Sequence, residues 1–403
     1  MLDSILLHGN SPEHAVDLGD LAEALLFYKK IFLVANENDL TALFQGIGVD
    51  TTLRMVEDGF LDLYLQMDGA ATHESSGSQG KVFDFIFWEK AKGPEGRVRS
   101  PQEMVKDAIR RVESRPGKGR RAANRLLRSA SSGRINDLFP ENQAVNRAAL
   151  HDLKNPEYVN LGIGAILEKY AMLSAVEKIV FDVEHSSEGI RVDTNLPLAD
   201  FSAQLRSRNP NASAFTVARV LDHFYKARLN LALAASYESE ILVSGVTCDL
   251  IRFLVGNRSL LGNRSFAELA EFQEVVLQGK NLGEVIRSGE RSFDELLPLV
   301  EKAERFREWL GDKPEDTSLV SEYLDSVTRE NWLSSTPGKS MRFLFFTGAG
   351  VALDTLFTGG LSTAAGIATG AFDAFVTDKL IDGWKPSQFV NEDLKMFTSG
   401  SRE

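Results

Sequence analysis

Short runs of β-branched and aromatic residues restrict the possible folds of this chain most, and they are concentrated in residues 1–195. Three such runs lie at 29–35, 61–67 and 81–88. In the third run phenylalanine alternates with other residues, which is typical of a strand with one buried face. Residues 177–184 and 189–194 flank Ser-Ser-Glu-Gly and predict a hairpin. These patterns predict strands that pair within the first half of the chain.

Helix and loop signals fill the space between those runs. Residues 39–47 and 51–57 are predicted to be helices. Residues 69–80 include few apolar side chains and are predicted to be a loop. With the strands, they indicate an α+β domain that has a small antiparallel sheet. A basic helical insert is expected at 100–155.

Strand signals almost vanish after the turn-forming segment 207–212, Ser-Arg-Asn-Pro-Asn-Ala. Residues 215–237 predict a long helix, and apolar residues at three- to four-residue spacing predict an amphipathic helix over 292–310. A length of 403 residues makes two domains the default. We therefore predict an α+β domain at 1–205, followed by a mainly α-helical C-terminal domain at 213–403.

Composition excludes some broad classes. With 43% hydrophobic residues and 25 phenylalanines the chain can bury a large core, so extensive disorder is not expected. The single cysteine, Cys248, cannot form a disulfide within the chain and is expected to be buried. The first residues lack the basic and apolar regions of a secretory signal, so we expect a cytoplasmic protein.

One segment is strongly basic within a chain of net charge −12. Residues 106–134 contain ten Lys or Arg and two acidic residues. A helix over 120–131 would place several arginines on one stripe, and such a stripe can follow a phosphate backbone. The residues predicted to bind a polyanion are Arg120, Arg121, Arg125 and Arg128. The alternative is a structural role, in which these arginines pair with the acidic excess of residues 284–330.

An apolar run at 343–372 is rich in glycine, alanine and threonine, and its sole charge is Asp354. Its uncharged stretch 355–372 has 18 residues, near the minimum for a membrane span, and contains Gly366-x-x-x-Gly370. We favour a small-residue-rich helical hairpin at 343–381 buried in the helical domain. Membrane contact is the less favoured alternative.

Two near-motifs do not predict a nucleotide site. Thr336–Ser340 ends in Gly-Lys-Ser, but Leu333 stands where a phosphate-binding loop needs glycine. Thr347-Gly-Ala-Gly350 resembles the opening of a sirtuin NAD site, but Leu353 replaces the third glycine of the dinucleotide fingerprint. No cofactor is therefore predicted.

Histidines supply the remaining candidates. Arg147/His151 and Arg219/His223 resemble the Arg-x4–6-His element of HEPN ribonucleases, in which His and Arg act at a scissile phosphate. Both intervals here are one residue shorter. The six histidines show no close ligand spacing, so no metal site is predicted and no catalytic residue is assigned.

Three functions follow from these patterns. The first is an intracellular interaction or regulatory protein that contacts nucleic acid, an acidic protein or another polyanion through the arginine-rich segment. The second is a membrane-acting effector that uses the apolar C-terminal run. The third is a nuclease-like enzyme with a site assembled from scattered Arg and His residues. The sequence leaves the oligomeric state open.

Overall fold

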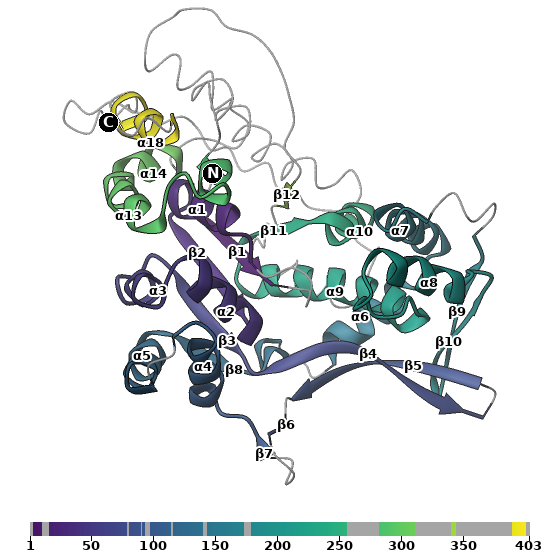
Figure 1. Ribbon diagram of the computed structural model, residues 1–403. Coiled ribbons are helices and arrows are strands. Elements are labelled where there is room, and N and C mark those ends of the chain that lie inside the picture. The colour runs from purple at the N-terminus through teal and green to yellow at the C-terminus, as the bar shows by residue number, and fades with distance from the viewer. Residues whose placement is uncertain are drawn as a thin grey trace, which may run out of the picture.

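The protein is described by a computed structural model (Figure 1). The described residues are 3–9, 16–78, 80–89, 91–92, 97–113, 116–139, 143–172, 179–255, 282–311, 340–343 and 389–399. The hairpin predicted at 343–381 lies outside them, apart from Phe343. No helix within these ranges has both the length and the apolar composition needed to cross a membrane.

A six-stranded sheet in the order β12-β11-β1-β2-β3-β8 forms the centre of the molecule. Its strands are β1 (Ser4–His8), β2 (Lys30–Ala35), β3 (Asp62–Gln66), β8 (Ser131–Gly133), β11 (Glu240–Ser244) and β12 (Ser340–Phe343). All neighbours are parallel except β11 and β12. The sequence predicted an antiparallel sheet only, so this mostly parallel sheet corrects that expectation.

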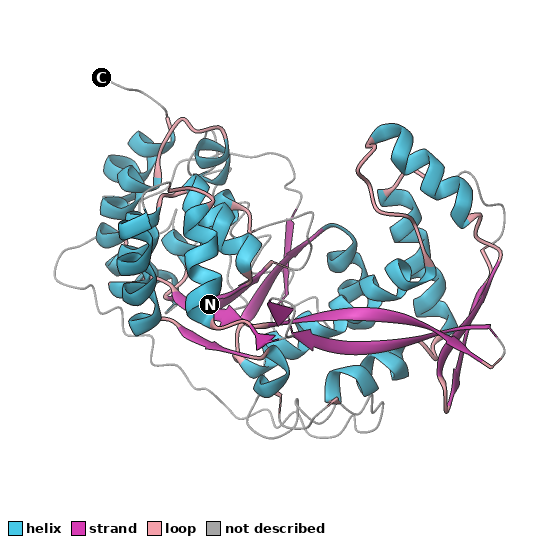
Figure 2. Cartoon of the chain, turned by 60° about the horizontal axis from the view of Figure 1, so that its bottom comes forward, coloured by secondary structure: helices cyan, strands magenta, loops and turns pink. Residues whose placement is uncertain are grey.

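The predicted antiparallel sheet is present as a second sheet in the order β4-β5-β10-β9. Its strands are β4 (Asp68–Gly77), β5 (Gly80–Glu89), β9 (Phe181–Ser186) and β10 (Gly189–Thr194). The β9–β10 hairpin is the one that the sequence predicts. The loop predicted over 69–80 is wrong, because β4 pairs with β5 along its whole length and this pairing satisfies the backbone of an otherwise polar segment. In Figure 2 the β4–β5 hairpin runs outward from the first sheet as a long twisted ribbon.

Helices cover both faces of the parallel sheet and divide its side chains between two cores (Figure 1). Along β1, Ile5 and Leu7 enter one core and Leu6 enters the other, as the alternation of a strand requires. The first core contains side chains from α1 (Leu18–Phe27), α2 (Glu37–Gly46), α3 (Val49–Glu57), α4 (Pro101–Arg110), α5 (Pro116–Ser129), α12 (Leu282–Arg287), α13 (Phe293–Lys302), α14 (Glu304–Gly311) and the C-terminal turns Phe389–Leu394 and α18 (Lys395–Thr398).

The second core contains side chains from α6 (Ala144–Asp152), α7 (Pro156–Lys169), α8 (Leu198–Arg208), α9 (Val217–Ser236) and α10 (Gly245–Val255). Cys248 of α10 is buried, as expected. The helix predicted over 292–310 is present as α13 and α14, which meet at Ala303.

The two-domain arrangement predicted around residues 206–212 is not confirmed by this packing. Strand β11 follows the expected boundary, yet it pairs with β1. Helix α9 shares a core with Leu6, and α12–α14 share the other core with Leu7. The physical reason is that β1 is buried on both faces and needs partners from both halves of the chain.

Candidate active site at the carboxyl edge of the parallel sheet

A pocket of about 290 Å³ lies where the carboxyl ends of β1, β2 and β3 meet. From β1 the chain continues to β2 and β3 on one side, whereas β11 joins β1 on the other side. Ligands of open α/β sheets bind where the strand order reverses in this way. We call this site the carboxyl-edge pocket. It is lined by His8, Gly9, Asn36, Glu37, Asn38, Gln66, Met67, Asp68, Gly69, Ala70, Trp88, Arg99, Met104, Lys226 and Leu229.

Each ring nitrogen of His8, the last residue of β1, faces a side-chain amide oxygen. Its Nδ1 lies 3.1 Å from Oδ1 of Asn230, and its Nε2 lies 3.2 Å from Oε1 of Gln66. The amide nitrogen of Asn230 donates to the Lys226 carbonyl at 3.0 Å, which leaves Oδ1 facing the ring. A neutral imidazole donates through one nitrogen only, so this arrangement assigns the proton to Nδ1. Nε2 then holds the electron pair. It accepts either from the Gln66 amide after a 180° turn or from a ligand.

The pKa of His8 is lowered, chiefly because burial disfavours the imidazolium. Hydrogen bonds to Asn230 and Gln66 act in the opposite direction, and the charge of Lys226 lowers the pKa further. His8 is therefore neutral at pH 7, and Nε2 can accept a proton.

The first turn of α2 fixes a second wall of the pocket. Asn36 caps the helix: its side chain accepts from the backbone of Asn38 and Asp39, and Asp39 accepts from the Asn36 backbone at 2.9 Å. Burial raises the pKa of Asp39 to about 6, while the hydrogen bonds from the backbone of Asn36 and Val16 oppose the rise. A Cβ on Gly9 would lie 1.9 Å from Oδ1 of Asp39, so the turn after β1 requires glycine here.

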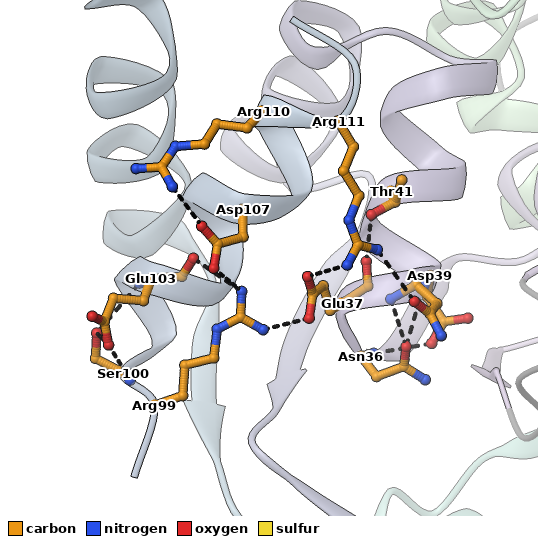
Figure 3. A network of polar contacts seen from close by, with 11 residues as sticks. Asn36, Glu37, Asp39, Thr41, Arg99, Ser100, Glu103, Asp107, Arg110 and Arg111 are labelled. Carbon is orange, nitrogen blue, oxygen red and sulfur yellow. Dashed lines mark hydrogen bonds and ion pairs between the residues drawn. The ribbon is translucent and has the colours of Figure 1, made fainter. Parts of the chain in front are cut away.

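A network of polar contacts connects the start of α2 to α4 (Figure 3). Arg99 is only 7% exposed and is ion-paired with Glu37 and, at 2.5 Å, with Asp107. Arg111 also reaches Glu37, at 2.7 Å. These contacts connect the start of α2 to α4 and compensate the charge of Glu37.

Asp68 lies where β3 passes into β4. Its carboxylate accepts from the backbone of Ile135 at 2.7 Å and of Asn136 at 3.4 Å. Burial raises its pKa, and these hydrogen bonds oppose the rise. The carboxylate therefore joins the two sheets to the segment after β8.

The predicted polyanion-binding residues lie elsewhere, on α5. Arg120, Arg121, Arg125 and Arg128 are all exposed, whereas Ala123 and Leu126 of the same helix are buried. We call these four residues the arginine face. Arg125 is ion-paired with Glu57 of α3 at 2.5 Å. This partner belongs to the N-terminal half of the chain, not to the acidic segment 284–330 proposed as the structural alternative.

The two Arg/His pairs have different environments. Arg147 and His151 are exposed on α6. On α9, Arg219 donates to the Tyr170 hydroxyl at 3.1 Å, and Nε2 of His223 lies 3.4 Å from the same oxygen. None of these four side chains lines the carboxyl-edge pocket. Within the described ranges, no cluster of three His, Cys, Asp or Glu residues could hold a metal ion.

No protein-family model, curated protein or solved structure matches the chain.

His8, Gln66 and Asp68 are not among the site residues predicted from the sequence. The available signal was positional, because the apolar runs at 5–7 and 63–65 are each followed directly by polar side chains. Polar residues after buried parallel strands gather at one edge of the sheet. That signal becomes informative only when the strands are known to be parallel.

Proposed function

We propose that the protein is an enzyme acting on a small polar ligand in the carboxyl-edge pocket, with His8 as its general base. The observation that carries the proposal is a neutral histidine, oriented by Asn230, at the end of the central strand β1 and at the point where the strand order reverses. A general base must be deprotonated at the working pH and must lie within reach of the ligand.

In the proposed mechanism, Nε2 of His8 accepts a proton from a ligand hydroxyl or from a water molecule. Asn230 keeps the ring orientation through its bond to Nδ1 and accepts from Nδ1 throughout the transfer. Arg99 acts indirectly. Its ion pair with Glu37 fixes the first turn of α2, which forms one wall of the pocket. The raised pKa of Asp68 favours a structural role for this carboxylate at the junction of the sheets.

Incubation of the protein with a pool of small metabolites, followed by mass spectrometry, tests the proposal. Wild type should consume at least one compound, and His8→Gln should lose this turnover while keeping the melting temperature. Asn230→Ala should reduce turnover less, because it frees the ring without removing the base. Equal consumption by wild type and His8→Gln, or no consumption by either, would contradict the proposal.

A second candidate function is polyanion binding by the arginine face, which has one supporting observation: all four arginines are exposed on a helix anchored by its opposite side. Binding to a generic oligonucleotide should weaken by roughly 0.7–0.9 log units per tenfold salt for each phosphate neutralised. Replacing Arg121, Arg125 and Arg128 by alanine should weaken binding to all sequences alike.

The matched control for this variant removes three exposed charges elsewhere: Lys154, Arg206 and Arg305. If the control variant lowers affinity as much as the triple alanine variant of α5, the effect comes from net charge and not from the arginine face. A stable α5 triple with unchanged affinity would refute this second candidate.

A further inference from the structure

We propose that the ligand of the carboxyl-edge pocket carries an uncharged, planar heteroaromatic ring of the nucleobase type, which stacks on Trp88. This inference rests on the proposed function of the pocket and specifies its ligand class. Three features of the pocket carry it: the placement of Trp88, the hydrogen-bonding capacity of the lining amides and the compensation of the lining charges.

Trp88 is the exposed aromatic side chain of the pocket. It remains 45% exposed although it lines the pocket, and it lies at the end of β5 directly opposite Gly69 of β4. A Cβ on Gly69 would lie 2.7 Å from indole atoms Cε2 and Nε1, so the indole packs against the bare backbone of this glycine. One part of the ring is thus held in place while the rest is open to solvent and to a ligand. Fixed, exposed aromatic rings are the platforms on which bases stack in proteins.

Apolar side chains extend this platform into the pocket. Met67, Met104 and Leu229 line it together with Trp88. Thioether groups are polarisable and pack well against aromatic rings. A flat ring stacked on Trp88 would therefore also meet apolar side chains.

The lining amides supply the complementary edge contacts. A side-chain amide can donate twice and accept twice. Within the described residues, the side-chain oxygen of Asn38 accepts from Arg111 at 3.4 Å, and the Gln66 amide faces Nε2 of His8, to which its NH2 group donates after the 180° turn. The NH2 group of Asn38 then remains as a donor for ring nitrogens and exocyclic oxygens of a base, and the oxygen of Gln66 remains as an acceptor. Paired donors and acceptors of this kind are what reading a base edge requires.

Charge distribution favours a nucleoside or free base over a polyphosphate. Glu37 is paired with Arg99, and Lys226 is paired with Asp222 at 2.7 Å. Two backbone N–H groups in the first turn of α2, those of Asn38 and Asp39, already donate to Asn36 and are not available to an anion. The volume of about 290 Å³ is just below the typical range of ligand pockets, about 300–1,000 Å³, and favours a small ligand.

Calorimetric titration of the full chain with adenosine, guanosine, cytidine, uridine and ribose tests the inference. At least one nucleoside should bind and ribose should not. Trp88→Ala should weaken that binding by roughly 5- to 150-fold, the range that corresponds to loss of one base–aromatic stack. Trp88→Phe should retain most of it, because the ring face is kept. Trp309 stacks on Phe306 in the first core and does not line the pocket, so Trp309→Phe is the matched control.

Several outcomes would overturn the inference. These are the absence of nucleoside binding, equal affinity of wild type and Trp88→Ala, and tighter binding of the triphosphate than of its nucleoside. A compound without an aromatic ring that wild type converts and His8→Gln does not would refute the ligand class and leave the proposed function intact. Nucleoside binding that depends on Trp88, without His8-dependent turnover, would support the ligand class and refute the proposal that the protein is an enzyme.

Discussion

The buried ion pair between Arg228 of α9 and Asp152 of α6 gives the sharpest stability prediction. The two side chains are 9% and 7% exposed, and Nε of Arg228 donates to Asp152 at 2.6 Å, with a second short bond from its terminal nitrogen. Arg228→Met would leave Asp152 buried without this partner. Breaking such a pair from one side typically costs about 3–5 kcal/mol, so we expect a loss of this size in the free energy of unfolding.

Arg99 provides the comparison, because its partners keep other cations. After Arg99→Met, Glu37 still has Arg111 at 2.7 Å and Asp107 still has Arg110 at 2.9 Å. We therefore expect a smaller loss of about 1.5–3 kcal/mol, the value typical of hydrogen bonds to charged groups. Both losses should be visible in urea unfolding followed by tryptophan fluorescence and by circular dichroism, whose agreement tests for a single transition.

A second substitution distinguishes the cost of an unpaired buried charge from the cost of lost packing. Asp152→Asn added to Arg228→Met should recover most of the stability, because no isolated charge remains. Burial is the main cause that raises the pKa of Asp152, and Arg228 opposes the rise, so the pKa should be higher still in Arg228→Met. The loss should then be smaller at about pH 5 than at about pH 8, since the folded state gains a proton. A loss below about 1 kcal/mol, or no recovery in the double variant, would refute the reasoning.

Two further predictions concern the partly buried His223 and two glycines. Burial, followed by the charges of Lys169, Lys226 and Arg219, lowers the pKa of His223 to about 3. The folded state thus binds fewer protons than the unfolded state between about pH 3 and pH 6.5, so His223→Gln should remove a stability loss of up to about 1.4 kcal/mol per pH unit on acidification. Equal pH dependence of urea unfolding in both proteins would contradict this. Gly9→Ala should lower the melting temperature, because its Cβ would meet Asp39 at a cost of about 1–3 kcal/mol. Gly164→Ala, in open space on α7, should raise stability by about 0.5–1 kcal/mol, and a Gly9→Ala protein as stable as this control would show that the turn after β1 can relax.

Segments in which apolar side chains repeat with the period of a helix or a strand could be predicted from the sequence. The strand at Lys30–Ala35, the hairpin of β9 and β10, and the long helix Val217–Ser236 lie close to their expected positions. The exposure of the arginine face follows from the same logic, because the apolar residues of α5 fix which side is buried. Each of these features depends on residues that are near one another in the chain.

Pairing between distant segments was decided only by the tertiary structure. Strand β11 joins β1 through Ile5 and Glu240, and its five residues carry no signal of the partner that they will find. The polar stretch of β4 is a strand because β5 lies beside it, not because of its own composition. The carboxyl-edge pocket has the same origin. His8, Gln66 and Asn230 come from separate parts of the chain and meet only because β1 and β3 are parallel and α9 packs against one face of their sheet. Local periodicity fixes which face of a segment is buried, whereas the choice of neighbour depends on contacts between segments far apart in the sequence.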